Sequence, residues 1–124
     1  MLSVGRHLRL PDGTKVIAGR HEGENRFLDR ARRTDQWRFQ TVDQRSPVAL
    51  VRGPLTREQV ELTAAIVAGY SKQREEPMVA VEVDDGTGVE LWEVAPLPQQ
   101  ELWRMNVGAS PSSLPVEALE PTRP

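Results

Sequence analysis

Residues 78–94 have the sequence MVAVEVDDGTGVELWEV, and this stretch decides the class of fold. Apolar and polar side chains alternate on both sides of residues 84–88, and a period of two is typical of a strand with one buried face. The Asp and Gly residues between the two runs supply the backbone conformations of a tight turn. The segment therefore predicts an antiparallel hairpin, and a turn explains its acidic tip better than a cation site does.

Further strands are predicted upstream of this hairpin. His7–Leu10 and Lys15–Ala18 flank a Pro-Asp-Gly-Thr turn and predict a first hairpin. Trp37–Asp43 alternates large apolar with polar side chains, and Val48–Val51 forms a short apolar run. Both segments are expected to add strands to the same sheet.

Two segments predict helices. Glu22–Arg33 places Phe27, Leu28 and Ala31 on one helical face among charged residues. Residues 56–76 open with the Thr-x-x-Gln spacing of a capping box and end before a proline. Because these helices interrupt short strands and hairpins stand at both ends, we expect an α+β fold. Its sheet is expected to be largely antiparallel, with five to six strands and the two main helices packed on it.

Composition sets the boundaries of the domain and excludes several chemistries. The 124 residues suit one domain, which we place at residues 1–107, and six of the ten prolines follow Ala95. Residues 108–124 are therefore expected to be a flexible Pro/Ser-rich tail. The chain has no cysteine, no apolar stretch of membrane-spanning length, and polar residues throughout positions 1–10, unlike a signal peptide. A cytoplasmic location without membrane contact is expected.

No catalytic constellation stands out in the sequence. The two histidines, His7 and His21, lie in no metal-binding or nucleophile motif, and the absence of cysteine excludes a thiolate zinc site. We therefore expect no catalytic residues, no metal, no cofactor and no enzymatic activity of the chain's own. The strand-to-helix junction at residues 19–23 could hold a phosphate on backbone amides, or its glycine could simply permit the turn.

The distribution of charge is uneven although the net charge is only −2. Residues 1–52 carry eleven Lys or Arg and six Asp or Glu, whereas the remainder has a net charge of −7. Ten of the eleven cations are arginines, whose planar guanidinium pairs with two phosphate oxygens at once. An arginine-rich first half favours an anionic partner such as RNA, and an ordinary solvated surface is the alternative.

Four segments in order carry a resemblance to a known family: GTKVIAGR at residues 13–20, ENRFL at 24–28, FQTVD at 39–43 and AAIVAGYSKQR at 64–74. They resemble the NFACT-R family of RNA-binding domains, and the Tyr-Ser-Lys-x-Arg ending is the most specific piece. Departures at His21, at Arg38-Phe39-Gln40 and at residues 45–48 are similar to a divergent bacterial branch associated with PP-loop tRNA thiouridine synthases. The resemblance implies a structured RNA partner, tRNA above all, and a separate PP-loop thiolation enzyme as a further partner.

Eight candidate RNA-binding residues result. The resemblance implies Arg20, Asn25, Lys72 and Arg74, and charge alone adds Arg26, Arg30, Arg38 and Arg45. The expected function is an accessory RNA-binding domain that contacts the tRNA backbone in tRNA thiolation or in a translation-related process. The alternative is a protein-interaction module that docks a larger enzyme through an exposed apolar patch around Trp92, Leu102 and Trp103 without touching RNA.

Overall fold

The structure, a computed structural model, describes residues 4–106. Within this part of the chain the elements follow in the order β1 (Arg6–Arg9), β2 (Lys15–Ala18), α1 (Glu22–Ala31), β3 (Gln36–Thr41), β4 (Ala49–Arg52), α2 (Arg57–Gly69), β5 (Val79–Asp84), β6 (Val89–Val94) and α3 (Gln99–Met105). The tail predicted for residues 108–124 lies outside the described residues.

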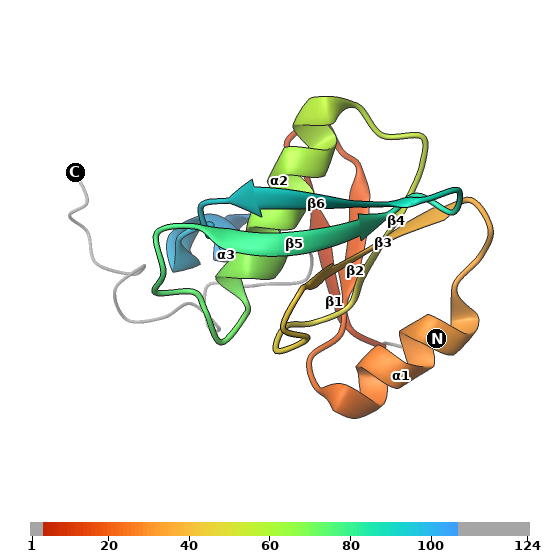
Figure 1. The fold of residues 1–124 in the computed structure, drawn as a ribbon, viewed down its shortest axis with the longest axis horizontal. Helices are drawn as coiled ribbons and strands as arrows, with labels where there is room; N and C mark the ends of the chain where they lie inside the picture. Colours follow the sequence, from red (N-terminus) through yellow and green to blue (C-terminus); the bar gives the residue numbers. More distant parts are fainter. Residues whose placement is uncertain (1–3, 107–124) are drawn as a thin grey trace.

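The six strands form one sheet in the order β1-β2-β4-β3-β5-β6, and every neighbouring pair is antiparallel (Figure 1). Both predicted hairpins are present, with Leu8 opposite Val16 in the first and Val81 opposite Trp92 in the second. The predicted α+β class with a largely antiparallel sheet is confirmed.

The two main helices cover opposite faces of this sheet. Along β2, Val16 and Ala18 belong to the larger core, which is packed by α2, whereas Ile17 between them packs with Leu28 of α1. Successive side chains on a strand point to opposite faces, so this alternation places α1 and α2 on different sides. Among the strands, α1 has its main contacts with β4, and α2 with β3, β5 and β6. Within residues 4–106, the face of β5 and β6 opposite α2 therefore has no extensive contact with a helix.

The capping box predicted for α2 is present. Thr56 accepts a hydrogen bond from the Gln59 backbone N–H at 3.1 Å, and the Gln59 side chain accepts one from the Thr56 N–H at 2.7 Å. The helix then buries mainly Val, Ala and Thr, whose small side chains let it lie close to the sheet. None of the helices within residues 4–106 has the length and apolar character needed to cross a bilayer.

The predicted end of α2 is wrong, because the helix stops at Gly69 and not before Pro77. Beyond this point the Lys72 backbone N–H donates to the Arg45 carbonyl at 2.9 Å, and so leaves the helical pattern for a tertiary contact. The buried Ser71 hydroxyl donates to the Ala68 carbonyl and accepts from the Gln73 N–H, which satisfies the end of the helix.

The expected apolar face of α1 is only partly correct. Leu28 is buried, but Ala31 is exposed and Phe27 is 38% exposed. The other buried residue of this helix is Glu24, a charged side chain that the apolar pattern assigned to solvent. The short helix α3 was not predicted at all.

Candidate nucleic-acid interface

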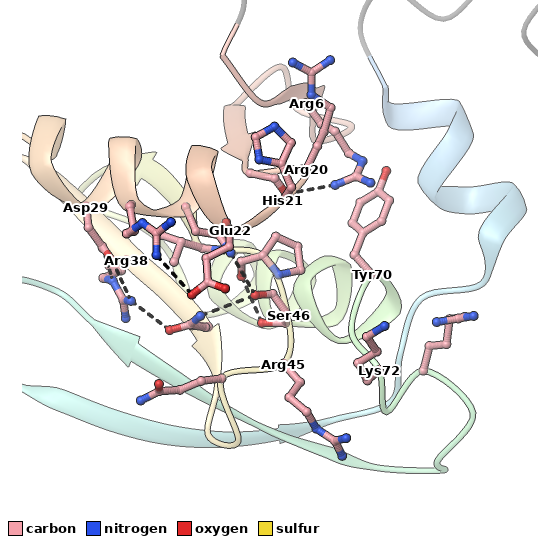
Figure 2. A pocket seen from close by; sticks show the side chains of 18 residues that line it. Arg6, Arg20, His21, Glu22, Asp29, Arg38, Arg45, Ser46, Tyr70 and Lys72 are labelled. Carbon is pink, nitrogen blue, oxygen red and sulfur yellow. Dashed lines mark hydrogen bonds and ion pairs between the residues drawn. The ribbon is translucent and has the colours of Figure 1, made fainter.

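A polar pocket of about 540 Å³ lies between α1, the loop that joins β3 to β4, and the segment that follows α2 (Figure 2). The side chains that line it come from distant parts of the sequence. Among the described residues, the lining carries seven cations, which are Arg6, Arg20, Arg26, Arg38, Arg45, Lys72 and Arg74, and two carboxylates, which are Glu22 and Asp29. Such an excess of positive charge in a concave surface attracts anions.

Hydrogen bonds hold the walls of the pocket together. The Asn25 side chain of α1 reaches the β3–β4 loop, where its Oδ1 accepts from the Val48 N–H at 2.9 Å and its Nδ2 donates to the Ser46 carbonyl at 3.5 Å. The same loop is joined from the other side by the bond from Lys72 N–H to the Arg45 carbonyl. These hydrogen bonds fix the walls of the pocket relative to one another.

Arg20 and Glu24 form a dense ion pair on the wall next to α1. The Glu24 carboxylate accepts from the Arg20 backbone N–H at 2.8 Å and from its guanidinium at 3.0 and 2.5 Å. These hydrogen bonds from Arg20 hold the pKa of Glu24 far below its ordinary value, so the carboxylate is ionised at neutral pH. The charge of Arg20 is thus largely matched, and the pair fixes the junction between β2 and α1.

Three other arginines of the pocket also have carboxylate partners. Arg38 is held by Asp29 at 2.6 Å, with its guanidinium side chain 21% exposed. The contacts of Arg26 with Glu22, at 3.7 Å, and of Arg45 with Asp43, at 3.1 Å, involve much more exposed arginines. Exposed pairs of this kind contribute little, so a phosphate could compete for Arg26 and Arg45 more easily than for Arg38.

The remaining cations gather around Tyr70, and we call Arg6, Tyr70, Lys72 and Arg74 the Tyr70 corner. The Arg6 guanidinium lies 4.3 Å from the centre of the Tyr70 ring and donates to the Gly19 carbonyl at 3.0 Å. Arg74 donates to the Ser71 carbonyl at 3.3 Å. No carboxylate within residues 4–106 forms an ion pair with Arg6, Lys72 or Arg74. Figure 2 shows Tyr70 between Arg6 and Lys72, so the corner combines unmatched positive charge with an aromatic ring.

The phenol of Tyr70 stays protonated at neutral pH. Burial raises its pKa above the ordinary value of 10.0, although the nearby Arg6 charge and a hydrogen bond with Asn106 act in the opposite direction. The hydroxyl is therefore a neutral hydrogen-bonding group and adds no negative charge to the corner.

The structure brings together seven of the eight candidate residues in this one pocket; the exception is Arg30, which lies further along α1. Lys72 and Arg74 sit in the turns after α2 and not on the helix. Sequence reasoning missed Arg6, which reaches the pocket because β1 pairs with β2 and sets Arg6 opposite Ala18. It included Tyr70 in a motif without assigning it a role.

The apolar patch expected around Trp92, Leu102 and Trp103 is not formed. Leu102 is 1% exposed and packs in the main core, and both tryptophans are partly buried. Exposed aliphatic side chains occur instead on β6, where Val89 is 57% and Leu91 66% exposed. By strand register they lie on the face of β6 opposite α2, where no helix within residues 4–106 makes extensive contacts.

The fold and the pocket define a small α+β domain whose concave basic surface suits a polyanion. The model of the family described as the NFACT protein RNA binding domain matches residues 5–105, and the chain therefore belongs to this family of RNA-binding domains. No curated protein matches the chain.

A solved structure supports the fold. The C-terminal part of the fibronectin/fibrinogen-binding protein from Streptococcus suis superposes with a TM-score of 0.75 at 15% sequence identity. The match covers 86% of this chain and 51% of that one, so the chain spans about half the length of the Streptococcus suis structure. At this identity the likeness shows a shared fold.

Proposed function

We propose that this domain binds the phosphate backbone of structured RNA, with tRNA as its ligand, and that the pocket is the contact surface. The observation that carries the proposal is the Tyr70 corner, where Arg6, Lys72 and Arg74 have no carboxylate partner within the described residues. Cations already matched by carboxylates gain less from a phosphate than unmatched ones. Membership of an RNA-binding family supports the same ligand class.

The proposed roles of the predicted residues differ. Lys72 and Arg74 contact phosphates directly, together with Arg6, while Arg26 and Arg45 exchange weak surface pairs for phosphate contacts. Arg20, Asn25 and Arg38 hold the walls in place through their bonds within the pocket. Phosphate contacts carry no sequence information, so the domain would position an RNA by shape and leave base selection to a partner.

We further propose that the domain serves tRNA thiolation beside a PP-loop enzyme. The chain contains no cysteine, so any sulfur relay must come from another protein. The support for this assignment is the resemblance of the quoted motifs to the branch associated with such synthases. In this arrangement the domain presents tRNA and the partner performs the chemistry.

The direct test is binding of tRNA by the full chain across a salt series, followed by fluorescence anisotropy. The pocket variant carries Arg6→Ala, Lys72→Ala and Arg74→Ala. Each lost phosphate contact is expected to lower the slope of log K against log salt by about 1, so the variant should lose about three units of slope and most of its affinity at low salt. Folding of the variant is checked by its thermal unfolding curve.

The matched control removes three exposed arginines that lie outside the pocket, with Arg9→Ala, Arg57→Ala and Arg104→Ala. It has the same net charge as the pocket variant. Equal losses in the two variants would show that only overall charge matters and would contradict a defined site. Absence of tRNA binding by the natural chain at low salt would overturn the proposal.

A second candidate function, docking of a larger enzyme, is favoured by the uncovered face of β5 and β6. Val89 and Leu91 are exposed there, beside the carboxylate of Glu82, which pairs with Leu91 in the sheet. A variant with Val89→Ser and Leu91→Ser tests it. Loss of binding to the purified PP-loop enzyme with unchanged tRNA binding would assign docking to this face, and unchanged binding to both would remove this candidate.

A further inference from the structure

A second cavity, of about 340 Å³, lies at the C-terminal end of α1. It is lined by Arg33, Asp35, Gln36 and Arg52, and shares no residue with the pocket described above. Gln36 opens β3 and pairs with Arg52 at the end of β4, so the cavity sits where the turn after α1 meets the sheet.

The charge of this region is positive and only weakly neutralised. Arg52 contacts Asp35 at 3.0 Å, but their side chains are 81% and 45% exposed, so the pair is screened by water. Arg33 is exposed, and so is Arg30 one turn earlier on α1. No carboxylate within residues 4–106 forms an ion pair with either of them.

The backbone that presents Arg33 is held in place by its neighbour. The Arg32 side chain turns inward, where it donates to the Gln36 carbonyl at 3.0 Å and to the Asp84 carbonyl at 3.0 Å. The Arg33 N–H donates to the Gln36 side chain at 2.8 Å. Arg32 thus fixes the turn, and Arg33 projects from a rigid backbone, which lowers the ordering cost of binding.

The arrangement of charge along α1 points to an anionic ligand. Arg26 and Arg30 are at the i and i+4 positions of α1, a spacing at which like charges destabilise a helix, and Arg33 follows two residues after Ala31, the last residue of α1. Of the carboxylates of α1, Glu22 makes only a 3.7 Å surface contact with Arg26, whereas Glu24 and Asp29 are paired with Arg20 and Arg38, and none of them forms an ion pair with Arg30. The dipole of the helix explains cations near its C-terminus, but it does not explain Arg52, which is on a strand.

We propose that Arg30, Arg33 and Arg52, here called the far site, bind a second stretch of phosphate backbone of the same RNA. This inference rests on the proposed function of the pocket. Arg26 lines the pocket and begins the arginine row, so it connects the two sites. Ten helical residues span about 15 Å, and a duplex strand has one phosphate per roughly 3.4 Å of its axis. In a base-paired stem this separation corresponds to about four to five base pairs, and we assign such a stem as the ligand.

The test compares two RNA hairpins that share a loop and differ in stem length, with stems of about 3 and about 12 base pairs. Binding of the full chain to each is measured by anisotropy across a salt series. The far-site variant carries Arg33→Ala and Arg52→Ala. Its matched control carries Arg57→Ala and Arg104→Ala, which removes the same charge from exposed positions outside both cavities.

The far-site variant is expected to bind the long stem about tenfold more weakly and to lose about two units of salt slope, with the short stem changed less than about twofold. Asp35→Asn, which removes the one carboxylate lining the far site, is expected to strengthen binding of the long stem only. Equal effects on both stems, or a far-site variant that behaves as its control, would overturn the far site. If the pocket variant still fails to bind in that case, the proposed function of the pocket is unaffected. Failure of the natural chain to bind either hairpin would overturn the pocket as well.

Discussion

Replacing Asn25 with alanine tests whether this residue acts as a structural clamp of the pocket. In the folded chain its Oδ1 accepts from the Val48 N–H at 2.9 Å, and its Nδ2 donates to the Ser46 carbonyl at 3.5 Å. Val48 is 1% exposed, so water has little access to replace the lost acceptor. Asn25→Ala would leave a buried backbone donor without a partner.

The size of the effect follows from these contacts. An unsatisfied buried donor costs about 2 kcal/mol, and the 3.5 Å bond to Ser46 is at the limit of hydrogen-bond distance and adds little. Alanine is a better helix former than asparagine, which offsets about 0.5 kcal/mol. The free energy of unfolding should fall by about 1.5 kcal/mol, and the melting temperature by roughly 5 °C.

Urea unfolding followed by circular dichroism measures this change, with thermal unfolding as a second readout. Arg26→Ala is the matched control, because this neighbour lies on the same helix and has only a 3.7 Å surface pair. It should change the free energy of unfolding by less than about 0.5 kcal/mol. A loss in Asn25→Ala no larger than in the control would refute the clamp, and a loss of RNA affinity without any loss of stability would assign Asn25 to direct contact.

Three further predictions concern the same framework. Because the pKa of Glu24 is held below its ordinary value of 4.5 by the hydrogen bonds from Arg20, its ionised form stabilises the fold above that pH and this contribution is lost as the pH falls below it. Acid unfolding curves of Glu24→Gln should therefore depend less steeply on pH below 4.5 than those of the natural chain. Thr56→Ala removes the capping box of α2 and should lower the free energy of unfolding by about 1 kcal/mol in urea titrations; an unchanged midpoint would contradict that role. Gly19→Ala would place a Cβ in steric clash with the Asn25 Oδ1 and should destabilise the fold by more than about 1 kcal/mol; an unchanged thermal unfolding curve would contradict this prediction.

Local patterns in the sequence were sufficient for most of the fold. Alternation and turn residues predict both hairpins, and the Thr-x-x-Gln spacing predicts the start of α2, because these signals act within a few residues. The end of α2 was mispredicted because it depends on a bond between Lys72 and Arg45, which are far apart in the sequence. No local rule reports such a contact.

The sequence was sufficient to predict most residues of the candidate site. It was less informative about what each of these residues does there. Charge and motif resemblance select seven residues that the fold does bring into one pocket. They do not reveal that Glu24 is buried under Arg20, or that Asn25 bonds to the neighbouring loop, because both depend on how α1 lies against the sheet. Arg6 was missed for the same reason, since it is placed by strand pairing across the first hairpin.

Under the proposed function, the bond between Lys72 and Arg45 also couples ligand affinity to completion of the fold. One wall of the pocket comes from residues 70–74, which follow all of α2 in the chain, so a nascent or truncated polypeptide that ends before them has the arginines of its first half but no enclosed site. A ligand that needs the complete pocket binds the native state alone and stabilises it, by about 2.7 kcal/mol at a hundredfold excess over Kd. RNA would thus protect the finished domain against unfolding and give no such protection to an incomplete chain.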